Sequence, residues 1–136
     1  MPSKGKVLLA EDALATQELS RRRLTQAGYD VEVFFNGLAL WQRYQEMIAS
    51  GEKPTAIVTD YQMPEMNGLE LIKRIREQDK NIPIVLATGN RISEMTLKSF
   101  GITLVSKPFD SDRSDLIGAL DKLLGLTNTE REISPG

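Results

Sequence analysis

Residues 7–12, Val-Leu-Leu-Ala-Glu-Asp, decide the fold: four apolar residues in a row lead directly into two carboxylates. An apolar run without alternation is typical of a parallel strand that is covered on both faces. Residues 56–59 and 84–87 have the same character. We therefore predict three central strands in one sheet.

Two further runs are expected nearer the edges of that sheet. Residues 31–34 alternate between apolar and polar side chains, and residues 103–106 are only half apolar, as expected where one face is less covered. Longer amphipathic stretches separate the five runs. Strands that alternate with helices along the whole chain predict an α/β fold with a mostly parallel sheet.

The amphipathic stretches predict which helical side chains enter the core, since residues three or four apart share one helix face. A short fourth helix is expected over residues 92–100. The expected core residues are Leu19, Leu24 and Ala27, with the small Thr16 and Ser20, in the first helix; Leu40, Trp41, Tyr44, Met47 and Ile48 in the second; Leu69, Ile72 and Ile75 in the third; and Leu116, Ile117, Leu120, Leu123 and Leu124 in the last.

Composition limits the class of protein. The 136 residues are 40% apolar and 26% charged, which suits one domain, expected over residues 1–125, with residues 126–136 as a flexible tail or linker. A net charge of -2 argues against direct nucleic-acid binding, and no apolar run approaches the roughly 20 residues of a membrane span. A cytoplasmic protein without membrane insertion is expected. Because Cys and His are absent, its chemistry must use carboxylates, hydroxyls and amines.

The residues that end the strands carry the candidate chemistry. In a parallel sheet, ligands bind at the carboxyl ends of the strands, where the sequence places Glu11 and Asp12, Asp60, Thr88 and Lys107. Three crowded carboxylates repel one another, and a hard divalent cation such as magnesium relieves that repulsion through oxygen ligands. Lys107 and Thr88 are suited to hold an anion beside the metal, and Asp60 can itself accept a phosphoryl group.

Each of these residues also has a purely structural interpretation. Asp12 could be the N-cap of the helix that follows. Thr88 could be a buried hydroxyl bonded to the backbone, and Lys107 a surface lysine. Their joint presence at four strand ends favours the phosphoryl site.

These motifs resemble the receiver domain of two-component response regulators, over residues 6 to about 124. The resemblance rests on residues 7–12, on residues 60–68 (Asp-Tyr-Gln-Met-Pro-Glu-Met-Asn-Gly), on Thr88-Gly89 and on Lys107-Pro108-Phe109. It implies a flavodoxin-like (βα)5 fold, that is, a doubly wound parallel five-stranded sheet of order 2-1-3-4-5.

The resemblance also implies a function. Asp60 would accept a phosphoryl group from a phosphohistidine on a sensor histidine kinase or a histidine phosphotransfer protein. The chain would then be a phosphorelay switch and not an enzyme with turnover. Glu11, Asp12, Asp60 and the backbone carbonyl of Gln62 would bind Mg2+ or Mn2+, Glu11 mainly through water.

Further roles follow from the same resemblance. Thr88 and Lys107 would hold the phosphoryl oxygens, Gly68 would form a tight turn beside the site, and Pro108 would follow a cis peptide bond. An effector domain or a second copy of the chain would bind through the fourth helix, the fifth strand and the fifth helix. The family commonly has an aromatic switch residue where this chain has Leu104, which is therefore the candidate switch partner of Thr88.

Other classes of function use similar residues. A magnesium-dependent phosphohydrolase of the aspartyl-phosphate kind carries a second acid two residues after its nucleophile, where this chain has Gln62. An FMN carrier needs a hydroxyl- and glycine-rich loop after the first strand, where Glu11 and Asp12 would repel phosphate. A degenerate receiver used only for docking is the third alternative, and the full set of acids with the lysine argues against it.

Overall fold

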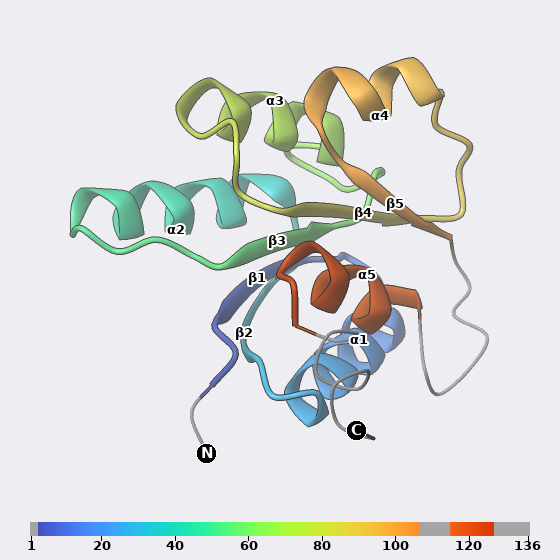
Figure 1. The fold of residues 1–136 in the computed structure, drawn as a ribbon. Helices are drawn as coiled ribbons and strands as arrows, with labels where there is room; N and C mark the ends of the chain where they lie inside the picture. Colours follow the sequence, from blue (N-terminus) through green and yellow to red (C-terminus); the bar gives the residue numbers. More distant parts are fainter. Residues whose placement is uncertain (1–2, 107–114, 127–136) are drawn as a thin grey trace.

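The computed structural model describes residues 3–106 and 115–126, and within them strands and helices alternate (Figure 1). No helix of these residues is both long enough and apolar enough to cross a bilayer. The strands are β1 (Lys6–Ala10), β2 (Asp30–Phe34), β3 (Ala56–Thr59), β4 (Ile84–Thr88) and β5 (Thr103–Ser106). The helices are α1 (Leu14–Gln26), α2 (Gly37–Ala49), α3 (Gly68–Gln78), α4 (Glu94–Phe100) and α5 (Asp115–Leu123).

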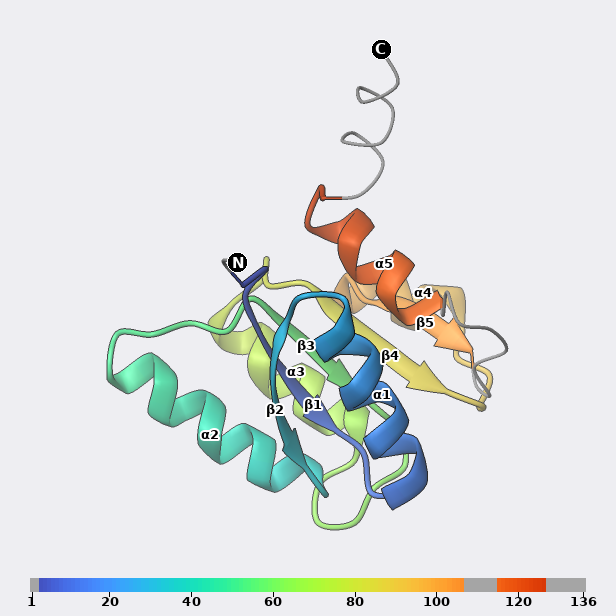
Figure 2. The ribbon, with the colours of Figure 1, turned by 90° about the horizontal axis from the view of Figure 1, so that it is seen from below.

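The strands form one parallel sheet of order β2-β1-β3-β4-β5. Helices α1 and α5 cover one face of this sheet, and α2, α3 and α4 cover the other (Figures 1 and 2). The doubly wound, flavodoxin-like sheet of order 2-1-3-4-5 is therefore confirmed. The two runs expected at the edges are the two edge strands, β2 and β5.

Both faces of the central strands are buried, which explains their unbroken apolar sequences. Leu8 of β1 belongs to a buried cluster that includes Leu40 of α2. Its neighbour Val7 belongs to a second cluster, with Leu24 of α1 and Leu116 of α5. Successive side chains of a strand point to opposite faces, so each central strand contributes to both clusters.

Some helical predictions are wrong. Ile48 and Leu123 are 39% and 42% exposed. Each lies in the last turn of its helix, and the spacing of apolar residues fixes where a side chain points but not how far the sheet extends beneath it. Helix α4 begins at Glu94 and not at Ile92, because the Ser93 side chain caps it by accepting a hydrogen bond from a main-chain N–H of its first turn.

An ion-pair network on β2 stabilises the fold in a pH-dependent way. Glu32 accepts hydrogen bonds from Arg43 (Nε to Oε1, 2.8 Å) and from Lys6 (Nζ to Oε2, 2.7 Å). These bonds, that of Arg43 foremost, outweigh burial and lower the pKa of Glu32 from 4.5 to about 2. Because its pKa is lower in the folded state, Glu32 stabilises the fold fully above pH 4.5, and this contribution is lost as the pH falls toward the folded pKa.

We expect Glu32→Gln to lower the free energy of unfolding by about 1 kcal/mol at neutral pH, a value that allows for the partial exposure of the network. At about pH 3 the difference from the wild type should fall below half of that, since much of the wild-type contribution is lost by then. Urea unfolding at both pH values measures it. Glu46→Gln is the control, because Glu46 is 70% exposed and lies 3.5 Å from Arg43, and it should change stability little. Equal differences at both pH values would contradict the shifted pKa.

Candidate functional site

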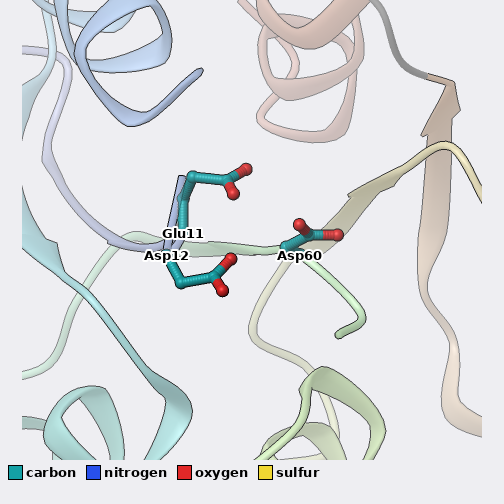
Figure 3. Close-up of side chains that lie close together, drawn as sticks. All are labelled: Glu11, Asp12 and Asp60. Atoms are coloured by element: carbon teal, nitrogen blue, oxygen red, sulfur yellow. The ribbon is translucent and has the colours of Figure 1, made fainter. Parts of the chain in front are cut away.

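The acidic residues predicted at the strand ends lie together at one edge of the sheet. Ala10 of β1 and Thr59 of β3 are partners in register, so the residues that follow them leave the sheet side by side. Carboxylate oxygens of Glu11, Asp12 and Asp60 lie within 4.8 Å of one another, and Figure 3 shows the three side chains gathered in one space. Glu11 is buried, Asp60 half-buried and Asp12 exposed, so this acidic cluster opens to the surface.

Glu11 is held at three points. Its N–H donates to the carbonyl of Phe34 (2.9 Å), and its own carbonyl accepts from Gln17 Nε2 (3.0 Å). Its carboxylate Oε2 accepts from the N–H of Ala13 (3.1 Å). Only 3% of the residue is exposed, so Glu11 is the buried and firmly positioned member of the acidic cluster.

Asp12 does not cap the helix that follows it. The N-cap of α1 is Ala13, and no side chain accepts a hydrogen bond there in the way a capping aspartate would. The capping interpretation of Asp12 is therefore wrong. Its exposed carboxylate is left to face the two other acids of the cluster.

Asp60 is held by hydrogen bonds to β1 and to its two neighbours in the chain. Its N–H donates to the carbonyl of Ala10 (3.0 Å), which ties it to β1. Its side-chain Oδ1 accepts from the N–H of Tyr61 (2.6 Å), and the Thr59 hydroxyl donates to its carbonyl (2.9 Å). The carboxylate thus lies in one fixed direction at the end of β3.

The chain packs tightly against Asp60 at the start of α3. Gly68 donates its N–H to the carbonyl of Tyr61 (2.7 Å), and a Cβ at this position would lie 2.0 Å from the carbonyl oxygen of Asp60. Only glycine allows this approach. Gln62, the predicted carbonyl ligand, is exposed and lies in the loop between Asp60 and α3.

The donor set of the cluster fits a hard divalent cation. All three side chains offer carboxylate oxygens, with no thiolate or imidazole in the sequence. Magnesium is bound in proteins by a few carboxylates and water, at an open site of this kind. Glu11, Asp12 and Asp60 are the residues that would hold it.

Gln17 is a residue that the sequence interpretation missed. It is only 4% exposed, and its Nε2 donates to the carbonyl of Glu11 and, at 3.4 Å, to that of Phe34. It therefore connects the ends of β1 and β2 beside the acidic cluster. Leu19 of the same helix, which was predicted for the core, is half-buried. Its spacing could have revealed it: Gln17 lies three residues before Ser20 and seven before Leu24, so it shares the buried face of α1 with them.

We expect Gln17→Leu to weaken Mg2+ binding about tenfold, because residues that orient metal ligands have effects of this size. Gln17→Met, which keeps a side chain of similar length but has no N–H donor, should bind as weakly. NMR titration of the amide of Ala13 with Mg2+ measures the affinity. Ser20→Ala, another buried polar position of α1, should leave it unchanged. Normal affinity in both Gln17 variants would show that this side chain serves stability alone.

Thr88 ends β4 and is bonded within its own loop. Its hydroxyl donates to Asn90 Oδ1 (3.0 Å) and accepts from the N–H of Asn90 (3.1 Å), and it is 1% exposed. Asn90 was not predicted, although a threonine two residues before an asparagine is a common turn pattern. Leu104 of β5 is half-buried and, with Ser106 and residues 89–93, lines a groove of about 560 Å³ beside this loop.

Two predicted site residues, Lys107 and Pro108, lie outside the described residues. The strand that leads to them, β5, ends at Ser106, the register partner of Thr88. Among the described residues, the structure therefore brings together Glu11, Asp12 and Asp60.

Known proteins resemble this chain in sequence and in structure. The sequence pattern of the response regulator receiver domain family matches residues 7–121. The response regulator receiver protein CpdR of Brucella abortus is 34% identical over 122 residues, which are 88% of this chain and 96% of that protein. The solved structure of Vibrio cholerae chemotaxis protein CheY4 has a TM-score of 0.75 and 27% identity, covering 90% of this chain and 99% of that one.

A further solved structure carries a metal ion. The receiver domain of sensor histidine kinase PA1611 from Pseudomonas aeruginosa has a TM-score of 0.75 and 24% identity, over 89% of this chain and 98% of that one. That protein has a magnesium ion coordinated in its active-site cleft. At this identity, the likeness shows a shared fold.

Proposed function

This chain belongs to the response regulator receiver domain family, a family of signalling domains of two-component systems, and on that premise we propose that it is a phosphoacceptor switch of a phosphorelay. Asp60 is the proposed acceptor, and a phosphohistidine on a sensor histidine kinase or histidine phosphotransfer protein is the donor. The observation that carries the proposal is the fixed Asp60 carboxylate within 4.8 Å of two further acids.

The proposed reaction needs little from the protein except orientation and charge balance. One oxygen of the Asp60 carboxylate attacks phosphorus, and the P–N bond of the phosphohistidine breaks. The electron pair of that bond remains on the imidazole nitrogen, which takes a proton from water. Magnesium, when bound by Glu11, Asp12, Asp60 and the Gln62 carbonyl, would offset the negative charge that builds up.

We assign the remaining roles by family membership. Thr88 and Lys107 would hold the phosphoryl oxygens, and the bonds between Thr88 and Asn90 would have to break for the hydroxyl to turn toward Asp60. Leu104 lies beside that loop and would follow this movement. Receiver domains act on effector domains, and we propose α4, β5 and α5 as the output surface, with residues 1–125 as the receiver and 126–136 as a tail or linker.

A phosphoryl-transfer experiment on the wild-type chain tests the function. With a small phosphoramidate and Mg2+, intact-mass spectrometry should show one phosphoryl adduct, and prior addition of EDTA should prevent it. Absence of an adduct from a folded protein with Mg2+ present would overturn the proposal in favour of a docking-only receiver. Release of phosphate in many turnovers would favour the phosphohydrolase instead.

The acidic cluster also predicts that its carboxylates increase Mg2+ affinity and lower the stability of the metal-free protein. We expect Asp12→Asn to weaken Mg2+ binding while leaving the melting temperature of the metal-free protein equal or higher, because one of three repelling charges is removed. NMR titration and thermal unfolding in EDTA measure the two effects. A large loss of metal-free stability would contradict a metal role for Asp12.

A further inference from the structure

A groove lined by basic residues lies far along α3 from the acidic cluster. It has a volume of about 540 Å³ and runs between α3 and the end of α4, which Figure 1 shows side by side on one face of the sheet. Its cations are Lys73, Arg76, Lys80 and Lys98, and we call it the basic groove. Glu77 is the single acidic residue that lines it among the described residues.

The lysines of the basic groove are not neutralised by the protein itself. Lys73, Lys80 and Lys98 are exposed and form no ion pair with a carboxylate of the described residues. By contrast, Lys6 and Lys53 lie 2.7 Å and 2.8 Å from their carboxylate partners. Since the whole chain carries a net charge of -2, this groove is a local positive region on an acidic protein.

Hydrogen bonds hold the side chain of Arg76 in place in the lining of the basic groove. Its Nε and Nη2 donate to the carbonyls of Phe100 (2.6 Å) and Gly101 (3.0 Å), and its Nη1 donates to that of Asp79 (3.1 Å). These bonds hold the C-terminal end of α4 against α3. The guanidinium is thus used by the fold, and the three lysines around it are the groups available to a ligand.

We propose that the basic groove binds an acidic segment of a partner protein. Lys73 lies on α3, Lys80 follows Asp79, the C-cap residue of that helix, and Lys98 lies on α4, so the three positive charges surround one groove. A segment that carries several carboxylates would complement these three charges. The half-buried Phe100 also lines the groove and offers an apolar contact.

The position of the groove keeps the two sites separate. Helix α3 begins at Gly68 beside Asp60 and runs away from it. The groove lies beside the C-terminal half of this helix and the residues that follow it. A partner held there would leave the acidic cluster open to a phosphodonor. The proposal therefore does not depend on phosphorylation of Asp60.

Fluorescence anisotropy with a labelled peptide tests the proposal. The probe is a glycine-serine peptide that carries several glutamates. Replacing Lys73, Lys80 and Lys98 together by Gln should weaken binding about tenfold, the sum expected of three exposed ion pairs. The matched control replaces Arg22, Arg91 and Lys122 by Gln, because these cations are also exposed and unpaired among the described residues, and it should change affinity less than twofold.

The peptide should also shift the NMR amide signals of residues 98–101 and not those of residues 11–13. Equal loss of affinity in the control variant would overturn the proposal, because binding would then follow net charge alone. The absence of peptide binding would also overturn it. So would tighter binding of pyrophosphate or of a single-stranded oligonucleotide at the same residues, since either would identify a different class of ligand.

Discussion

Gly68→Ala should destabilise the metal-free protein by about 3 kcal/mol, which corresponds to a fall of roughly 10 °C in melting temperature. The added Cβ would lie 2.0 Å from the carbonyl oxygen of Asp60 and 3.0 Å from the Cα of Tyr61. Both are main-chain atoms at the end of β3, so no flexible side chain can move aside. The start of α3 must shift away from Asp60, and the hydrogen bond from Gly68 to Tyr61 is lost or lengthened.

Gly118→Ala is the matched control for this substitution. Gly118 lies within α5, and a Cβ there would meet nothing within 4 Å. Alanine is the better helix former, so this variant should be more stable than the wild type by up to about 1 kcal/mol. Urea and thermal unfolding in EDTA compare the two variants. A Gly68→Ala variant as stable as the wild type would show that the contact between α3 and β3 is loose.

The strands were predictable because of how completely they are covered. A central strand with helices on both sides needs apolar side chains in both directions, and that requirement leaves an unbroken apolar run such as residues 7–10. Trp41 was likewise predicted for the core from helical spacing and is 8% exposed. The order of the strands came from the family resemblance, since periodicity carries no information on which strands are neighbours.

Hydrogen bonds between distant segments were not predictable in this way. Gln17 donates to carbonyls of Glu11 and Phe34, and Arg76 donates to carbonyls at the end of α4. A polar side chain that bonds to the main chain of another element leaves no trace in a hydropathy pattern. The basic groove was missed for the same reason, because its lysines come from α3, from the residues after α3 and from α4, whose proximity only the fold establishes.

The acidic cluster was predictable because its prediction requires only the direction of the strands and the residues that follow them. Parallel strands end at one edge, and Glu11, Asp12 and Asp60 directly follow two strands that proved to be adjacent. Thr88 also ends a strand, but its hydroxyl is bonded to Asn90. Its local loop, and not its position on the strand, sets the direction of that side chain in this structure.

Asp60→Asn should remove the phosphoryl adduct entirely, which is the largest effect expected of any substitution in this chain. An amide oxygen is a far weaker nucleophile than a carboxylate, so asparagine cannot form the acyl phosphate. The fold should remain, because the asparagine side chain keeps an oxygen that can accept from the Tyr61 N–H, as the Asp60 carboxylate does at 2.6 Å. Removing one of three repelling charges should also leave stability equal or higher.

Asp30→Asn is the matched control for the loss of the adduct. Asp30 is an exposed aspartate at the start of β2. It lies at the amino ends of the strands, whereas the acidic cluster lies at their carboxyl ends, so this substitution removes the same charge far from the cluster. Intact-mass spectrometry after phosphoramidate and Mg2+ should show the wild-type adduct in Asp30→Asn and none in Asp60→Asn. An adduct of wild-type yield in Asp60→Asn would mean that another carboxylate is the acceptor, and peptide mapping would then have to find it at Glu11 or Asp12, the two acids within 4.8 Å.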